Sequence, residues 1–395
     1  MDEWKKVRVG DIGKVITGKT PKTSNSEYYG GNIPFLTPSD DMSVKYVRGT
    51  NKYITESGRL SVKNATLPAN AICVSCIGSD LGKVVITTQE TVTNQQINSI
   101  VVDTDKFDID FVYYSMLELG KILNFHSKTS TAVPIVNKSS FSQYEIDCPK
   151  LNTQKRIGTI LSSIDKKIEE NNQINNNLEQ QMEALFRSLF IENANSTWQE
   201  GVLSDLGTIV AGGTPSKAKP EYYAEHGIAW ITPKDLSLNK SKFISHGEND
   251  ISELGFSKSS ATKMPAGTVL FSSRAPIGYI AIAANELTTN QGFKSVVPNE
   301  NIGTAFMYFL LKWLLPTIER MASGSTFKEI SGTGMKSVPV VIPDDKTIEQ
   351  FNDFCNPIFL KQEILEAENI RLSNIRDTLL PKLMSGELDV SDIDL

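Results

Sequence analysis

Cysteine and histidine are scarce in this 395-residue chain, which has 4 cysteines and 3 histidines. So few cysteines suit a reducing compartment, and we expect a cytoplasmic protein. Cys73 and Cys76 form a C-x-x-C pair, but no second pair or histidine cluster completes a metal site. In the second half of the chain, which repeats the first, Leu270 and Ser273 stand at these positions. We therefore interpret the pair as two small thiols on a strand and expect no bound metal.

The sequence also lacks an export signal and a long apolar run. Residues 1–6 contain no apolar segment of the kind found in signal peptides, so the N-terminus is expected to be mature and unexported. The longest apolar run, residues 306–318, is interrupted by Lys312 and Pro316. It is too short to span a bilayer and is predicted to be a core helix, so no membrane partner is expected.

The short motifs that suggest catalysis are all incomplete. Residues 356–359 (NPIF) are similar to the Asn-Pro-Pro-Tyr/Phe loop of adenine methyltransferases but lack its second proline. Lys83 follows a glycine without the rest of a phosphate-binding loop, and residues 331–334 lack the acidic residue of a dinucleotide site. The Asp and Lys of residues 343–346 are similar to the carboxylate and lysine cluster of a nuclease, but no distant partner completes that cluster. No catalytic residue and no cofactor are predicted for this chain.

Glycine and proline are absent between Gly158 and Gly201. From Ile157 to Leu185 an apolar residue stands at every seventh position except Asn171. This pattern predicts a helix of about 34 residues, about 50 Å long, and the same pattern returns near the C-terminus. The predicted seam residues are Ile157, Ile164, Asn171, Leu178 and Leu185 in the first helix and Phe351, Ile358, Leu365, Leu372 and Leu379 in the second, with Ile174, Phe354 and Ile375 among the companion positions.

Two helices with matching seams in one chain favour a coiled coil in which each packs on the other. The alternative is that each helix lies separately on its neighbouring domain. Asn171 stands where the second helix has Leu365, so one seam has a polar residue that would fix register at some cost in stability.

The strongest organisational signal is an internal repeat at an offset of 194 to 197 residues. The repeated pieces are Trp4 and Trp198, Thr20-Pro21 and Thr214-Pro215, Thr93-Asn94-Gln95 and Thr289-Asn290-Gln291, and Ser130-Thr131 and Ser325-Thr326. Each half has strand-like runs, at residues 7–16, 71–77 and 84–87 or 202–210, 268–272 and 279–283, followed by a helix at 109–124 or 303–320. This mixture predicts an α+β fold.

Several repeated pieces carry a family resemblance. They are residues 36–40 (LTPSD) and 231–235 (ITPKD), the Thr-Asn-Gln segments, residues 182–190 (MEALFRSLF) and residues 376–388 (RDTLLPKLMSGEL). This ordered set, which covers essentially the whole chain, resembles the specificity subunit of type I restriction-modification systems. The resemblance implies two target recognition domains, residues 1–150 and 196–343. Two long antiparallel coiled-coil helices, residues 151–195 and 344–395, separate them.

The resemblance also implies a non-catalytic function. Each recognition domain would read one half of an asymmetric, interrupted site in double-stranded DNA, and the helices would set the gap and dock two methyltransferase (modification) subunits. Restriction (translocase) subunits would join them, and S-adenosylmethionine, ATP and Mg²⁺ are expected on the partner subunits. A protein with two readers on a rigid spacer suits two spaced half-sites. The alternative from a different class is a coiled-coil adaptor that presents two protein-binding domains and binds no nucleic acid.

Charge indicates where DNA would bind. Residues 344–395 have 12 Asp and Glu against 5 Lys and Arg, whereas both recognition domains are close to neutral. Binding must therefore come from local basic loops. The candidate DNA-binding residues of the first domain are Thr17, Gly18, Lys19, Thr20, Lys22, Asn94, Gln95 and Lys128. Those of the second domain are Gly213, Thr214, Ser216, Lys217, Arg274, Asn290, Gln291 and Lys328.

These residues are chosen for their chemistry. Glycine turns, hydroxyls and lysines suit phosphates, the amides of asparagine and glutamine suit adenine, and Arg274 suits guanine. For the Thr-Asn-Gln segments a role as scaffold stays equally open, because they occur in both halves. Differences between the halves, such as Ile77 where Arg274 stands, should carry specificity, so the two domains are expected to read different half-sites.

Overall fold

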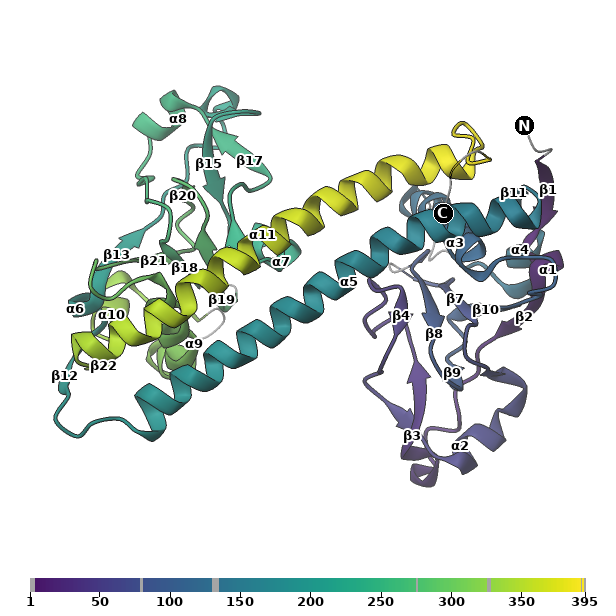
Figure 1. Cartoon of the computed structure of the whole chain (residues 1–395), viewed down its shortest axis with the longest axis horizontal. Helices are drawn as coiled ribbons and strands as arrows, with labels where there is room; N and C mark the ends of the chain where they lie inside the picture. The colour runs from purple at the N-terminus through teal and green to yellow at the C-terminus, as the bar shows by residue number, and fades with distance from the viewer. Residues whose placement is uncertain are drawn as a thin grey trace. The chain divides into compact units, whose positions relative to one another are not determined.

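A computed structural model of the chain describes residues 4–78, 81–129, 135–274, 276–324, 328–391 and 393. The chain forms two compact units (Figure 1). Unit 1 contains Met1–Glu169 and Ile370–Leu395, and unit 2 contains Glu170–Asn369. Each unit therefore combines one strand-rich domain with part of both long helices.

Unit 1 is built around a five-stranded sheet in the order β2-β10-β7-β8-β4, antiparallel except for the parallel pair β4 and β8. The strands are β1 (Lys5–Arg8), β2 (Gly13–Thr17), β3 (Tyr29–Leu36), β4 (Tyr46–Val47), β5 (Tyr53–Ile54), β6 (Thr66–Leu67), β7 (Ile72–Ser75), β8 (Val84–Thr87), β9 (Thr91–Thr93), β10 (Ile97–Val102) and β11 (Glu145–Cys148). The helices are α1 (Val9–Ile12), α2 (Glu56–Ser61), α3 (Ile109–Thr129) and α4 (Lys138–Gln143), with 3-10 turns η1 (Ser26–Tyr28) and η2 (Lys63–Ala65). A second sheet has the order β5-β3-β9-β6, and β1 pairs with β11.

Unit 2 repeats this plan, with a five-stranded sheet in the order β13-β21-β18-β19-β16. The strands are β12 (Gln199–Val202), β13 (Gly207–Ala211), β14 (Tyr223–Ala224), β15 (Ile228–Ile231), β16 (Phe243–Ile244), β17 (Asn249–Ile251), β18 (Val269–Ser273), β19 (Ile277–Ala283), β20 (Thr288–Thr289), β21 (Lys294–Pro298) and β22 (Pro339–Ile342). The helices are α6 (Leu203–Leu206), α7 (Pro233–Leu238), α8 (Glu253–Ser257), α9 (Thr304–Met321) and α10 (Gly332–Lys336), with a 3-10 turn η4 (Pro220–Tyr222). The matching strand orders confirm the α+β class and the duplication.

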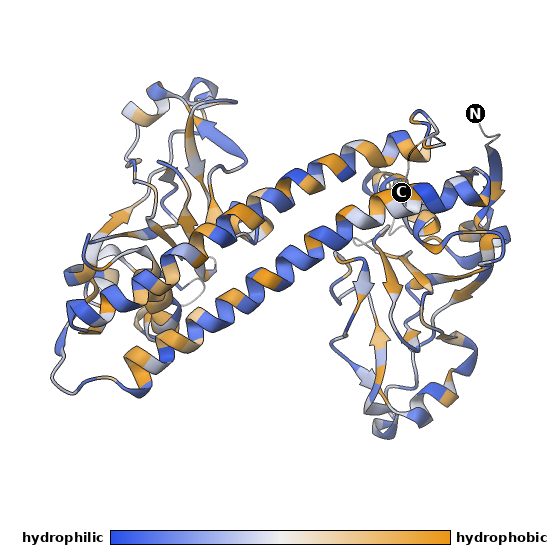
Figure 2. Ribbon diagram, viewed as in Figure 1, coloured by the Kyte–Doolittle hydropathy of each residue, from blue (hydrophilic) through white to orange (hydrophobic). Residues whose placement is uncertain are grey.

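The core of each domain lies between the five-stranded sheet and one helix. In unit 1, Phe111 and Tyr114 of α3 are fully buried in a cluster with sheet residues such as Ile72. In unit 2, α9 has nine buried residues and packs on the aromatic cluster of the C-terminal end of α5, where Phe186 lies against Phe306. Figure 2 shows α9 as strongly hydrophobic. The predicted core helix at residues 306–318 is therefore confirmed.

One strand prediction is wrong. Residues 7–16 do not form one run of strand, because helix α1 interrupts them between β1 and β2. Val9 and Ile12 are both fully buried, and a spacing of three residues places them on one face of a helical turn. The equivalent run at residues 202–210 is interrupted in the same way by α6.

Two long helices join the domains: α5 (Leu151–Arg187), which continues as a π-helical turn η3 (Ser188–Glu192), and α11 (Asp345–Met384). Their pairing is antiparallel within each unit, because residues of increasing number on α5 contact residues of decreasing number on α11. In unit 1, Arg156 Nη1 donates to Val390 O at 3.0 Å just beyond α11, and Arg376 Nη1 donates to Asp165 Oδ1 at 2.8 Å.

In unit 2, Asn171 Nδ2 donates to Glu368 Oε2 at 2.9 Å, and Gln362 Nε2 donates to the backbone oxygen of Asn175 at 3.0 Å. The helices therefore pack on each other, as predicted, rather than lying separately, and each also packs on a domain.

The predicted seam residues fall into two groups. Ile157, Asn171, Phe351 and Leu365 are buried, whereas Ile164, Leu178, Leu185, Ile358, Leu372 and Leu379 are half-buried. The companion positions Ile174, Phe354 and Ile375 are 41–44% exposed, so their assignment to the seam is wrong. On α11 the buried side chains instead include Cys355, Phe359 and Gln362, because the domain of unit 2 covers that side of the helix.

Candidate nucleic-acid interface

In unit 1, two loops far apart in sequence form one surface. The loop after β2 is held to the loop before β10 by hydrogen bonds from Gly18 N to Ile97 O at 3.0 Å and from Thr20 Oγ1 to Gln95 Oε1 at 2.6 Å. A Cβ atom at Gly18 would lie 2.0 Å from the backbone oxygen of Asn94, so only glycine permits this approach. The sequence repeat thus marks a pair of loops that belong together.

Unit 2 contains the same pair of loops. Gly213 N donates to Thr289 O at 2.9 Å, as its equivalent Lys19 N donates to Thr93 O at 2.8 Å in unit 1. The Thr214 hydroxyl donates to the side-chain oxygen of Gln291. A Cβ atom at Gly212, the equivalent of Gly18 in unit 1, would lie 2.0 Å from the backbone oxygen of Asn290. The same contacts therefore shape the candidate surface in both domains.

The asparagines of the Thr-Asn-Gln segments are engaged in their own turns. Asn94 Oδ1 accepts from Gln96 N at 3.1 Å, and Asn290 Oδ1 accepts from Gly292 N at 2.8 Å. These contacts favour the scaffold interpretation for both asparagines. Gln95 and Gln291 are exposed beside them, and the side-chain oxygen of each accepts from a threonine hydroxyl of the paired loop.

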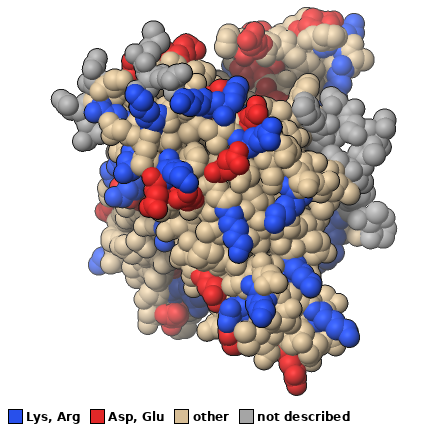
Figure 3. Space-filling view, turned by 90° about the vertical axis from the view of Figure 1, so that its right-hand side faces the viewer, with Lys and Arg blue, Asp and Glu red and all other residues tan. Residues whose placement is uncertain are grey.

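The candidate cations lie at the surface, as phosphate contacts require. Lys19, Lys22, Lys128, Lys217 and Lys328 are exposed, as is Ser216. Thr17 is less available, because its hydroxyl donates to buried Asn98 at 2.6 Å. The Ser-Thr pairs at residues 130–131 and 325–326 lie outside the described residues. Figure 3 shows one face of the molecule, on which Lys and Arg are scattered among acidic and uncharged residues.

Arg274 is part of a polar cluster that the sequence did not reveal. Its Nη1 atom lies 3.5 Å from Glu329 Oε2, and Lys294 Nζ lies 3.9 Å from the other oxygen of the same carboxylate. Burial lowers the pKa of Lys294, and Glu329 opposes that shift. A half-buried carboxylate thus holds two cations, of which Arg274 is the more exposed.

The equivalent region of unit 1 has different chemistry. Asn98 stands where Lys294 stands, is 2% exposed and donates to Val136 O at 3.0 Å. Ile77 stands at the position of Arg274 and forms an isolated bridge with Ile135, as Arg274 does with Glu329. A comparison of Asn98 with Lys294 in the repeat is the sequence signal that would have found this difference.

Other candidate chemistry is limited among the residues the structure describes. Cys73 and Cys76 are fully buried on and beside β7, and burial raises the pKa of their thiols to about 12 and about 11. Their interpretation as buried thiols is confirmed. Within the described ranges, no cluster of three or more metal-ligating side chains occurs. No helix in the residues that the structure describes is both long and apolar enough to cross a membrane.

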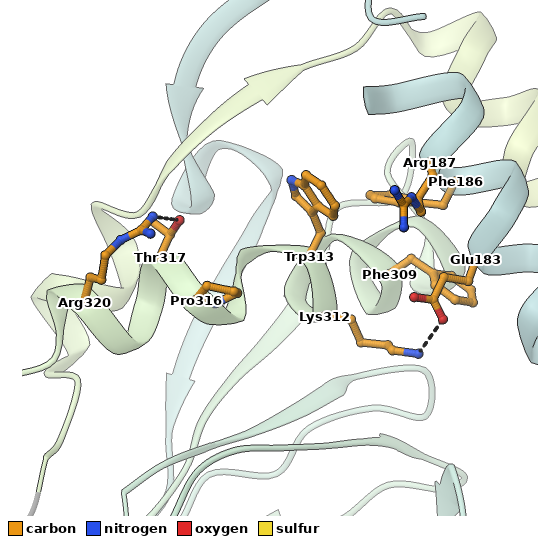
Figure 4. Close-up of a pocket in the computed structure, with 9 residues that line it drawn as sticks. All are labelled: Glu183, Phe186, Arg187, Phe309, Lys312, Trp313, Pro316, Thr317 and Arg320. Atoms are coloured by element: carbon orange, nitrogen blue, oxygen red, sulfur yellow. Dashed lines mark hydrogen bonds and ion pairs between the residues drawn. The ribbon is translucent and has the colours of Figure 1, made fainter. Parts of the chain in front are cut away.

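A cavity of about 390 Å³ lies in unit 2 between the end of α5 and α9. Figure 4 shows Trp313 and Pro316 on α9, and Phe186 and Arg187 on α5, at its wall. Trp313 is 46% exposed. The cavity lies where the domain packs on α5, and none of its lining residues is in the paired loops.

Comparison with known proteins agrees with this architecture. The family model described as "Type I restriction modification DNA specificity domain" matches residues 1–180 and again residues 195–372. The chain therefore belongs to the type I restriction-modification DNA specificity family. It carries two copies of the family's recognition domain.

Two curated relatives are similar to this chain over different lengths. It is 35% identical over 199 residues to the MjaIX specificity subunit of Methanocaldococcus jannaschii, a match covering 48% of this chain and 46% of the relative. The chain thus matches about half the length of that relative. It is 24% identical to the HindI specificity subunit of Haemophilus influenzae over 98% of this chain and 100% of the relative.

A solved structure supports the fold. The S subunit of a type I restriction-modification system from M. genitalium aligns over 97% of this chain and 96% of its own length, with a TM-score of 0.63 and 18% identity. At that identity the likeness concerns the fold alone.

Proposed function

We propose that this chain is the DNA sequence-specificity subunit of a type I restriction-modification complex and is itself non-catalytic. Each recognition domain reads one half of an asymmetric bipartite site in double-stranded DNA. The long helices set the gap and dock two modification subunits, and restriction subunits join the complex. The partner subunits, not this chain, bind S-adenosylmethionine, ATP and Mg²⁺.

One observation carries the proposal: the same pair of loops is built twice, with different side chains beside it. The Thr20–Gln95 and Thr214–Gln291 contacts hold equivalent loops in the two domains. Arg274 in one domain and Ile77 in the other then give the two surfaces different chemistry. A common scaffold with domain-specific side chains suits two readers of two different half-sites.

Salt dependence distinguishes this function from an adaptor that binds no nucleic acid. If Lys19, Lys22, Lys128, Lys217 and Lys328 each neutralise one phosphate, the log–log plot of affinity against salt has a slope of about −4.5. The measurement uses the complex with its modification subunits and duplex DNA. A flat response, or no duplex binding, favours the adaptor.

Charge-removal variants locate the contacts. Lys19→Gln combined with Lys22→Gln should reduce the slope by about 2, because each phosphate contact contributes about 0.9. Lys361→Gln is the matched control, since Lys361 is exposed on α11 rather than on the paired loops. An equal loss of slope in the control and the loop variant would place DNA elsewhere on the chain.

A further inference from the structure

Two buried lysines occupy equivalent places in the two domains. Lys45 immediately precedes β4, and Lys242 immediately precedes β16. Their side chains are 8% and 7% exposed. The Lys45 ammonium group lies 4.8 Å from the ring centroid of Tyr114 on α3, and the Lys242 ammonium group lies 4.8 Å from that of Tyr308 on α9. A lysine surrounded by aromatic rings is thus common to both domains.

In unit 2 this lysine also binds both long helices. Lys242 Nζ forms an ion pair with Glu179 of α5 and donates to Gln362 Oε1 of α11 at 2.6 Å. The backbone N–H groups of Lys242 and Phe243 donate to the two oxygens of Glu366, also on α11, at 2.9 and 3.0 Å. A single loop of the domain therefore contacts both helices through directional hydrogen bonds.

A second cation completes the cluster. Lys312 of α9 lies 2.7 Å from Glu179 and 3.5 Å from Glu183, and Figure 4 shows the latter ion pair between α9 and α5. Burial raises the pKa of Glu179, but the attraction of Lys242 and Lys312 outweighs burial and leaves that pKa below its ordinary value. Glu179 is therefore ionised at neutral pH and holds two cations of the domain against α5.

In the first domain the equivalent lysine does not bind the long helices. Lys45 pairs at 2.7 Å with Asp110 of α3, which belongs to its own domain. Polar links from this domain to α5 are made by Tyr114, whose Oη donates to Asp165 at 2.5 Å, and by Arg48 just after β4, which forms an ion pair with Glu169. Asp165 also accepts from Arg376 of α11 at 2.8 Å. Direct binding of the lysine to both helices is thus particular to the second domain.

We infer that Lys242 is a positioning residue that, with Glu179, Gln362 and Glu366, fixes the angle of the second recognition domain on the long helices of unit 2. Charged hydrogen bonds are directional, so a tilt of the domain would break several at once, whereas apolar packing tolerates small sliding. The inference rests on the proposed function, in which a changed angle moves the reading loops along the DNA. The cluster then makes the complex intolerant of an altered gap between half-sites.

The test measures tolerance of gap length by the complex with its modification subunits. The wild-type complex first defines its own methylated motif, and duplexes then carry that motif with the native gap or with one base pair added or removed. We expect Lys242→Met to leave both half-site sequences unchanged and to reduce discrimination against the altered gaps by about tenfold, the effect of losing one charged hydrogen bond.

Two lysine controls separate positioning from general effects. Lys240→Met removes an exposed lysine from the same loop and should keep wild-type discrimination. Lys45→Met removes an equally buried lysine that pairs within its own domain, and it should lower stability without relaxing the gap. If Lys242→Met does not fold, Glu366→Gln is the milder variant, because the amide oxygen still accepts one backbone hydrogen bond.

The outcomes are distinct. Discrimination equal to wild type in folded Lys242→Met or Glu366→Gln overturns the positioning role while leaving the proposed function intact. The same relaxation in Lys45→Met also overturns it, because any buried lysine would then suffice. A wild-type complex that binds duplexes without regard to motif or gap overturns the proposed function, and the positioning role falls with it.

Discussion

Leu365 on α11 gives the sharpest test of the helix pair. Its side chain is 3% exposed, so its burial contributes about 2–3 kcal/mol. Burying a carboxylate in the same place costs several kcal/mol more. We expect Leu365→Asp to destabilise unit 2 by about 5 kcal/mol, which is comparable with the whole stability of a typical domain. Loss of assembly with the modification subunits should follow.

The neighbouring residue supplies a matched control. Ile364 is 52% exposed on the same helix, so Ile364→Asp should change stability by less than about 0.5 kcal/mol. The assay is urea unfolding followed by helical circular dichroism, together with co-purification of the modification subunits. Leu178→Asp should have a smaller effect than Leu365→Asp, because Leu178 is half-buried. Equal shifts for Leu365→Asp and Ile364→Asp, or a full complex that contains Leu365→Asp, would refute the reasoning.

Three further predictions concern other parts of the chain. Asn171 is fully buried and its Oδ1 atom has no partner among the described residues, so Asn171→Leu should raise the free energy of unfolding by about 1 kcal/mol, whereas exposed Asn176→Leu should not. Replacing residues 196–343 with the equivalent domain of a relative should change one half of the methylated motif and leave the gap unaltered, as methylome sequencing would show. Burial raises the pKa of all four thiols to about 11 or 12, so a thiol reagent at pH 8 should label the native chain slowly. The stability that protonated thiols contribute to the folded chain should be lost only as pH rises from about 8.5 through 11. Rapid labelling of the native chain would contradict the burial of Cys73, Cys76, Cys148 and Cys355.

Features that are local in the sequence were predictable. The long helices follow from the seven-residue pattern, and the duplication follows from repeated pieces such as Thr93-Asn94-Gln95. The seam was predicted only in part, because a heptad pattern assumes that a helix packs on one partner. On α11 the domain also covers the helix, which buries Cys355 and leaves Phe354 44% exposed.

The polar clusters could not be predicted because their members are distant in sequence. Glu179, Lys242 and Gln362 come from three separate segments, and each reads in isolation as an exposed surface residue. Lys294 likewise meets Glu329 only through the fold. Periodicity reports which face of one element is buried, but it carries no information about which charges meet there.

The discontinuous composition of unit 1 has a consequence for synthesis on the ribosome. Its core cluster includes Leu380, Leu383 and Val390, which pack with residues such as Val9 and Phe111. The contiguous unit 2 is translated between these two parts, so the domain begun first is completed last. Until residues 370–393 emerge, part of the first core remains open to water, and an apolar surface of this kind invites aggregation or chaperone binding. Nascent chains truncated near residue 369 should therefore hold a finished second unit beside an unfinished first one.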